Sequence, residues 1–403
     1  MAPPFRADQI GSLLRPPSLL SARQSLSSPS QMYEDTEDTS VKKAEQDAIN
    51  EAVQTQLSLF IRPICSGEYC RHIFYGGFFE TLGGMTPIPD LPILEAFRTD
   101  FPTTTKLAQM GATTRAAVIC TGPIRWTKPA YLEEWRMLTA NVPKEKWHEC
   151  KLTMPAPSYQ HIQLKPGTTY TVSSGYTSDE QYFADLAKAY VSEMMALYEA
   201  GCRNIQIDDP HLTYFCSSQF LDGCHKDGTD THALLDLYLR AHDMFLQHLP
   251  KDLGVGIHLC RGNMSGSTHW VSGSYDSIAE KLFNETGYGT FYLEFDDTER
   301  QGGFEPLRFL PKGKNVVLGL VSTKRAELES VETIKGQVDE AGGVIAKARG
   351  VTRDEAKDCL ALSPQCGFSS SSLAGGKDMS MERMWEKLVL VRDAARAIWS
   401  DAT

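Results

Sequence analysis

Residues 204–210 read NIQIDDP, a short β-rich run that ends at two aspartates and a proline. A helical pattern at residues 178–200 precedes this run. It opens with Ser-Asp-Glu, a typical helix start, and stops before Gly201. The same order of short strand, polar or Gly/Pro break and helical pattern recurs along the whole chain. Strands that alternate with helices predict a parallel sheet rather than a sandwich.

Eight runs of the chain fit the strand part of this pattern. They cover residues 9–12, 57–65, 116–120, 204–207, 254–257, 291–295, 316–321 and 360–362. The clearest helical patterns cover residues 39–60, 178–200, 233–249 and 381–399. Eight strand–helix units predict an α/β fold, a single (β/α)₈ TIM barrel with loop insertions that spans residues 1–403. A doubly wound open sheet is the alternative.

One irregular stretch interrupts the pattern. Residues 126–157 contain Trp126, Trp135 and Trp147 in a polar setting. We interpret this stretch as a lid or an insertion on the barrel.

Composition excludes several classes of protein. The formal net charge is −11 and there is no block of basic residues, which argues against nucleic acid as a partner. No run of about 18 apolar residues is present, so no membrane partner is expected. Residues 1–9 lack the charged start and apolar core of a signal peptide. We therefore expect a cytoplasmic protein whose ten cysteines are reduced.

The side chains that carry chemistry stand at the ends of the predicted strands, which is the catalytic face of a barrel. Turns explain Asp, Gly, Pro and Ser at these places, but not His, Cys or Glu. His258 and Cys260 are two residues apart and so point to the same side of an extended strand. A His-x-Cys pair alone is more often no metal site. With Glu294 and Cys366 from two further strand ends, it forms a set of four ligands that suits tetrahedral Zn²⁺.

A second group of cysteine and histidine competes for this role. Cys216, Cys224 and His225 follow the strand at residues 204–207, but they match no common zinc-finger spacing. We interpret this group as incidental, and the cysteines within or beside strands as small buried apolar side chains.

Five motifs occur in an order that resembles the catalytic barrel of cobalamin-independent methionine synthase, in the superfamily that includes uroporphyrinogen decarboxylase. They are Ile10-Gly11-Ser12, Ser66-Gly67-Glu68, IQIDDP at residues 205–210, His258-Leu259-Cys260 and SPQCG at residues 363–367. The resemblance covers nearly the whole chain. It implies that the zinc ligands are His258, Cys260, Glu294 and Cys366. It also implies that the amino-acid part of a thiol substrate is bound by Ile10, Ser12, Glu68 and Asp208.

The resemblance implies a zinc-dependent thiol S-methyltransferase of methionine biosynthesis, similar to methyltetrahydropteroyltriglutamate–homocysteine S-methyltransferase. In that family zinc activates the sulfur of homocysteine for methyl transfer from a folate. The expected partners are therefore homocysteine and a methyl-folate, with Zn²⁺ as the cofactor. The chemistry is reasonable because a coordinating metal deprotonates a thiol, whose ordinary pKa is about 8.5.

The chain also departs from the family pattern. Full-length methionine synthases of this type have two barrels, whereas 403 residues have room for one. After the strand at residues 316–321 the family carries a histidine thought to protonate the folate, and here Ser322-Thr323-Lys324 stands instead. Residues 295–303 depart as well. Trp126 is a candidate for stacking on a pterin, although core or lid packing is the simpler explanation.

These departures keep other functions open. The replacement at Lys324 motivates a zinc-dependent thiol alkyltransferase with a different electrophile: an epoxide, a thioether or a methyl-corrinoid protein. A metal-free barrel like uroporphyrinogen decarboxylase and a non-catalytic binding barrel are two further alternatives. The metal content of the protein separates these alternatives.

Overall fold

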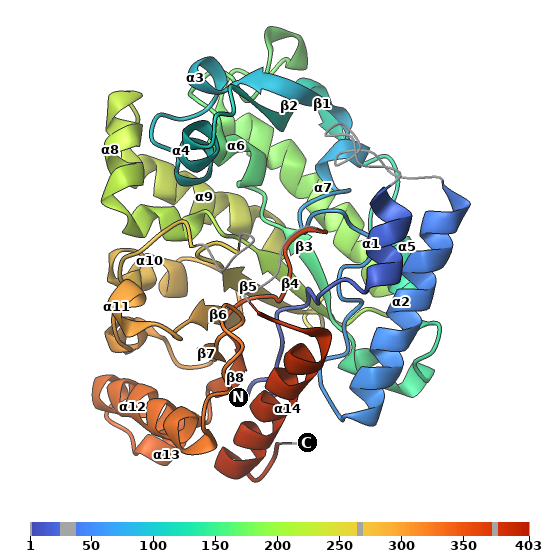
Figure 1. Cartoon of the computed structure of the whole chain (residues 1–403). Helices are drawn as coiled ribbons and strands as arrows, with labels where there is room; N and C mark the ends of the chain where they lie inside the picture. Colours follow the sequence, from blue (N-terminus) through green and yellow to red (C-terminus); the bar gives the residue numbers. More distant parts are fainter. Residues whose placement is uncertain (1, 25–37, 264–268, 373–377, 403) are drawn as a thin grey trace.

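Six parallel strands form the central sheet, in the order β3-β4-β5-β6-β7-β8 (Figure 1). They are β3 (Leu152–Pro155), β4 (Asn204–Asp208), β5 (Gly254–Leu259), β6 (Thr290–Glu294), β7 (Asn315–Val321) and β8 (Leu360–Pro364). The computed structural model describes residues 2–24, 38–263, 269–372 and 378–402. Four of the five strands after β3 are almost wholly buried, as expected for strands covered on both faces.

Two short segments near the N-terminus continue the parallel pairing from β8 back to β3. Ala7 forms a parallel bridge with Leu362 of β8, and Ser12 forms one with Gly67. Ile64 in turn pairs with Cys150, two residues before β3. With these segments as the first two strand positions, the α/β TIM-barrel prediction is confirmed.

The helices surround these strands (Figure 1). They are α1 (Pro17–Gln24), α2 (Thr39–Ser58), α3 (Ile93–Ala96), α4 (Pro102–Gln109), α5 (Leu132–Thr139), α6 (Tyr159–Gln163), α7 (Asp179–Glu199), α8 (Ser218–Lys226), α9 (Thr231–Leu246), α10 (Ala279–Asn284), α11 (Thr298–Gln301), α12 (Val331–Arg349), α13 (Arg353–Lys357) and α14 (Met381–Ile398). The Ser178 side chain caps α7 by accepting from the Gln181 amide, as its sequence predicts. None of the helices among the described residues is long and apolar enough to cross a membrane.

Three of the eight predicted barrel strands differ from the structure. Residues 116–120 belong to β2 (Thr114–Arg125), which pairs antiparallel with β1 (Gly83–Pro92) in a separate two-stranded sheet. Residues 57–65 are not a regular strand, because α2 continues to Ser58 and Ile64 makes only an isolated bridge. Residues 9–12 are not a regular strand either, because Ser12 makes only an isolated bridge. Residues 116–120 and 57–65 have local apolar patterns that suit a barrel strand. However, β2 is partly exposed along its length, whereas the barrel strand β3 is buried throughout.

The third barrel strand lies inside the irregular stretch 126–157. Residues 152–155 of that stretch are β3, and α5 before it packs against α2 and α7. The end of the stretch is therefore part of the barrel wall. Its four residues are too few to show a strand pattern in the sequence.

The register of the sheet aligns one layer of side chains across the barrel. Asp208, His258, Tyr292, Val317 and Ala361 are successive partners from β4 to β8. Neighbours in register point to the same face of a sheet, so these side chains share the barrel interior. Residues that follow this layer by two, such as Cys260 and Glu294, consequently lie at the carboxyl ends of the strands.

Candidate metal centre

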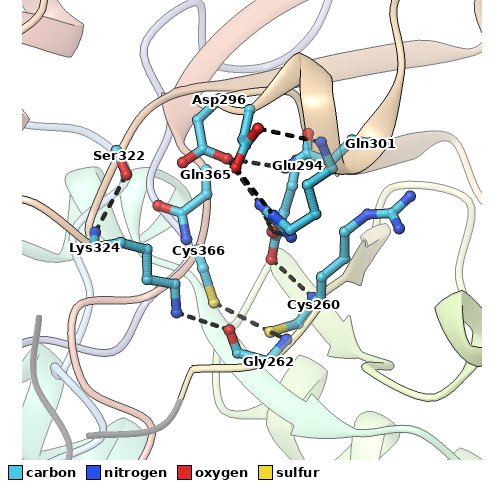
Figure 2. Close-up of polar contacts among 12 residues, drawn as sticks. Cys260, Gly262, Glu294, Asp296, Gln301, Ser322, Lys324, Gln365 and Cys366 are labelled. Atoms are coloured by element: carbon cyan, nitrogen blue, oxygen red, sulfur yellow. Dashed lines mark hydrogen bonds and ion pairs between the residues drawn. The ribbon is translucent and has the colours of Figure 1, made fainter. Parts of the chain in front are cut away.

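Four side chains converge at the carboxyl ends of β5, β6 and β8. One ligand atom from each of His258, Cys260, Glu294 and Cys366 lies within 4.8 Å of the others. The two Sγ atoms are 3.3 Å apart, although 106 positions separate the two cysteines in the sequence (Figure 2). In the part of the chain that the structure describes, no other group of His, Cys, Asp and Glu meets this condition, so Cys216, Cys224 and His225 form no such site.

The backbone explains how these residues meet. His258 is in β5, and Cys260 is the first residue after this strand. The two-residue period of the strand therefore directs both side chains inward. Glu294 ends β6 and pairs in register with Gly319 of β7. A Cβ atom at Gly319 would lie only 2.6 Å from the Cα of Gln365. The glycine therefore permits the turn that carries Cys366 to approach the other ligands.

His258 has an unpaired nitrogen at the centre of this group. Its Nδ1 lies 3.3 Å from the Tyr292 carbonyl oxygen, which selects the tautomer with the proton on Nδ1. The Nε2 atom is buried and has no hydrogen-bond partner. A metal-binding histidine commonly shows this arrangement, with one nitrogen held by a carbonyl and the other available.

The two thiols have opposite pKa shifts. A hydrogen bond from Cys366, together with His258 and Lys324, holds the pKa of Cys260 well below its ordinary value. The same hydrogen bond, together with burial, raises the pKa of Cys366 well above the ordinary value. These opposite directions favour the thiolate at Cys260 over the thiolate at Cys366, and the thiolate is the form of cysteine that binds a metal.

The Glu294 carboxylate has protein partners on both oxygens. Oε1 accepts a hydrogen bond of 2.9 Å from the Arg261 amide, and Oε2 lies 3.4 Å from two guanidinium nitrogens of Arg300. Burial, with the nearby Cys260, raises the pKa of Glu294 to about 7. A guanidinium nitrogen of Arg300 also donates to Oδ1 of Asp296 at 3.2 Å. Figure 2 shows Asp296 beside Glu294.

This donor set fits zinc. Two sulfurs, one imidazole nitrogen and one carboxylate oxygen are ligands that Zn²⁺ takes in tetrahedral sites, whereas Mg²⁺ and Ca²⁺ prefer oxygen alone. The orphaned Nε2 of His258 is the sharpest sign, because a buried polar atom without a partner is costly unless a ligand satisfies it.

Two further buried carboxylates, Glu68 and Asp208, lie near each other, and Asp208 is next to His258. The Oε1 atom of Glu68 accepts a 2.6 Å hydrogen bond from the Thr153 hydroxyl, while Oε2 has no partner. Asp208 is the register neighbour of His258 and accepts from Gln206 at 2.7 Å. Burial raises the pKa of both carboxyl groups, that of Asp208 to about 7. An ammonium group of a substrate would satisfy these oxygens.

The first strand segment borders the same site. The Ser12 carbonyl accepts from the Phe368 amide at 3.0 Å, and a Cβ at Gly367 would lie 1.8 Å from the Ser12 hydroxyl oxygen. Ser12 therefore packs directly against the residue after Cys366. Ile10 is placed differently: its side chain packs in the barrel interior, and its carbonyl accepts from Gln206 at 2.8 Å.

Trp126 is not brought to this group. Its indole nitrogen donates to Glu193 of α7 at 2.9 Å, and the same carboxylate accepts from the amides of Ala130 and Tyr131. These contacts attach the segment after β2 to an outer helix. The structure thus supports packing rather than ligand stacking for this tryptophan.

Sequence reasoning missed two residues that shape the site. Thr153 escaped notice because β3 itself was not predicted. Arg300 lies in α11, within the stretch 295–303 that departs from the family pattern. Its spacing of four residues from Asp296 was the one local signal, since such pairs are neighbours on a helical turn.

Comparison with known proteins identifies relatives over the whole chain. Residues 165–395 match the family model described as cobalamin-independent synthase, catalytic domain. Two uncharacterized proteins of Bacillus subtilis (strain 168), YxjH and YxjG, are each 32% identical to this chain. Each alignment covers 98% of this chain and 95% of the relative.

Solved structures agree with this match. A Listeria monocytogenes protein, provisionally described as a vitamin-B12-independent methionine synthase, is 26% identical, with a TM-score of 0.70 and 99% coverage of both chains. A B12-independent methionine synthase from Shewanella sp. W3-18-1, in complex with selenomethionine, is 18% identical. Its TM-score is 0.65, with 98% of this chain and 97% of that chain covered, which shows the shared fold. Relatives of about the same length as this chain therefore occur.

Proposed function

The chain belongs to the family of cobalamin-independent synthase catalytic domains, and from this membership we propose that it is a zinc-dependent thiol S-methyltransferase. We further propose homocysteine as the favoured acceptor and a methyl-folate as the favoured donor. In the overall reaction the methyl group moves from nitrogen to sulfur. An S–H and an N–CH₃ bond are thereby replaced by an S–CH₃ and an N–H bond.

The convergence of His258, Cys260, Glu294 and Cys366 is the observation that carries this proposal. Zinc bound by these residues would keep a substrate thiol deprotonated at neutral pH and thus nucleophilic. Buried donors with an orphaned Nε2 favour this function over a metal-free barrel of the uroporphyrinogen decarboxylase kind.

The neighbouring side chains have the chemistry to hold an amino-acid thiol. Glu68 and Asp208 present buried oxygens to an ammonium group, and Ser12 lies next to Gly367 on the same rim. Charge-assisted hydrogen bonds of this kind orient a substrate as well as bind it. The substrate sulfur would then lie near the four donors, in a site that excludes most water.

A second function, thiol alkyl transfer with another electrophile, is favoured by one observation. Lys324 stands where the family carries a histidine, and its ammonium is already bound to the Gly262 carbonyl and to Asn263. A methyl-folate needs a proton on its leaving nitrogen. An epoxide, a thioether or a methyl-corrinoid protein has no leaving nitrogen, so these donors do not need that proton.

Metal analysis and a donor assay test these proposals. We expect about one zinc per purified chain, little zinc in Cys260→Ser and Cys366→Ser, and methionine formed from homocysteine and a methyl-folate. Absence of zinc from the wild-type protein would contradict zinc-dependent transfer of any kind. Zinc without methionine, across methyl-folates of different glutamate number, would exclude the folate donor and retain the alternative electrophiles.

A further inference from the structure

Lys324 is the third residue after β7, between the two turns that carry the cysteines. Its side chain is buried, and Nζ donates to the Gly262 carbonyl oxygen at 2.7 Å and to Oδ1 of Asn263 at 2.6 Å. Figure 2 shows the side chain reaching from the end of β7 toward Gly262, beside both sulfurs. A buried ammonium requires acceptors, and both of these belong to the turn after Cys260.

Gly262 connects Lys324 to the first sulfur. Its amide donates to Sγ of Cys260 at 3.2 Å, while its carbonyl accepts from Lys324. The residue has φ +111°, and a Cβ there would lie 2.1 Å from Trp270, so only glycine suits this turn. The peptide that contacts the sulfur is therefore held in place by the lysine.

Asn263 and Thr323 extend the connection to the second sulfur. Nδ2 of Asn263 donates to the Gly367 carbonyl at 2.8 Å, and the Thr323 hydroxyl lies 3.2 Å from the same oxygen. The Thr323 amide also donates to the side chain of Gln365. Gln365 and Gly367 are the neighbours of Cys366, so hydrogen bonds join the β5, β7 and β8 turns in one network.

We propose that Lys324 is a positioning residue that braces the Cys260 and Cys366 turns against each other and thereby sets the spacing of the two sulfurs. This inference rests on the proposed zinc site and assigns Lys324 a role other than proton donation. Two sulfurs bound 2.3 Å from a tetrahedral ion lie about 3.8 Å apart. The separation of 3.3 Å between the two sulfurs is close to that distance.

Variants at both ends of β7 provide a matched test. Lys324→Met removes the brace, and Lys324→Arg keeps a charged donor. Lys314→Met is the control, because Nζ of Lys314, just before β7, donates to the carbonyls of Phe283 and Thr286, remote from the sulfurs. Zinc affinity is measured by chelator competition, and the thiolate-to-metal absorption of Co²⁺-substituted protein reports the sulfur geometry.

We expect Lys324→Met to weaken zinc binding about 10–100-fold, as removal of an outer partner does, and to alter the Co²⁺ absorption. Lys324→Arg restores part of both signals, and Lys314→Met changes neither. Asn263→Ala combined with Lys324→Met has less than the sum of the single effects, since both act in one network. If Lys324→Met kept wild-type zinc affinity and Co²⁺ absorption, the proposed positioning role of Lys324 would be overturned.

A metal-free measurement separates this proposal from the proposed function. Phenylarsine oxide bridges two adjacent thiols, so its capture by the apo protein, compared with Cys366→Ser, reports the Cys260–Cys366 spacing without zinc or methyl transfer. Slower capture in Lys324→Met supports the brace even if the wild-type protein transfers no methyl group. Unchanged capture contradicts the brace even if methyl transfer is demonstrated.

Discussion

Two buried polar groups lie inside the barrel, and they differ in how fully their hydrogen bonds are satisfied. Nζ of Lys151 donates to Asp8 at 2.7 Å, to Gln206 at 2.8 Å and to the Gln9 carbonyl, and the second Asp8 oxygen accepts from Tyr292 at 2.9 Å. We call this the lysine cluster. The candidate metal centre one layer away leaves Nε2 of His258 without a partner.

The contrast teaches how to distinguish structural from functional polar groups. Tyr292 belongs to both: its hydroxyl donates to Asp8, and its carbonyl faces His258. The lysine cluster and His258 are therefore both buried beside Tyr292, and they differ in how completely their hydrogen bonds are satisfied. A satisfied network stabilises the fold, whereas an unsatisfied one is expected to bind a ligand.

The largest effect is expected from the sulfurs of the candidate metal centre. Cys260→Ser or Cys366→Ser should lower zinc affinity by more than the roughly 10–100-fold typical of an outer partner, while the thermal midpoint of metal-free protein changes little. Cys202→Ser, a buried cysteine far from the centre, is the control and should keep its zinc. Equal zinc contents in all three variants would contradict the assignment of Cys260 and Cys366 as zinc ligands.

The lysine cluster should respond in the opposite way. Lys151→Met leaves the buried Asp8 carboxylate without its ion-pair partner, and breaking such a pair destabilises a protein by about 3–5 kcal/mol. Denaturant unfolding should detect this loss, while the folded fraction still binds zinc with wild-type affinity. If Lys151→Met were stable but had lost its zinc, the lysine cluster would be part of the zinc site and the distinction between the two groups would be contradicted.

His211 tests the rule at an ambiguous position. Its Nδ1 is also without a partner, but its ring packs among Phe101, Tyr159 and Tyr214. Burial lowers its pKa from 6.5 to about 3, against the influence of Asp209. Below pH 6.5, His211 therefore binds a proton in the unfolded chain but not in the folded chain. The free energy of unfolding consequently falls as the pH decreases toward 3.

The variant His211→Phe should remove this pH dependence. Relative to wild type, its free energy of unfolding should rise by about 1.4 kcal/mol between pH 7.5 and pH 5.5. Denaturant titrations at the two pH values measure the difference. Parallel pH profiles for the two proteins would show that the folded chain protonates His211 as readily as the unfolded chain, which would contradict the lowered pKa.

The smallest effect is expected at Trp126. Trp126→Phe removes one hydrogen bond to Glu193, which keeps two backbone donors, so about 1 kcal/mol of stability should be lost. The KM for the methyl donor should stay within twofold of wild type. A large rise in this KM, with stability unchanged, would place the tryptophan in the donor site after all.

Sequence reasoning located the strand ends better than the strands. Residues 116–120 and 152–155 are both short apolar runs, yet the former lies in a hairpin and the latter in the barrel. Local patterns report burial and period, and they do not report the pairing partner. The polar residues at strand ends were found because histidine, cysteine and glutamate have no role in turns.

The sequence by itself determined the alternation of strands and helices, the shared side to which His258 and Cys260 point, and the types of donor at each strand end. These properties follow from the two-residue and 3.6-residue periods, which are local. Only the tertiary structure decided that Cys366 meets Cys260, that Thr153 holds Glu68, that Trp126 packs on α7 and that Lys324 joins two turns. Those contacts depend on pairing between distant strands, which no local pattern encodes.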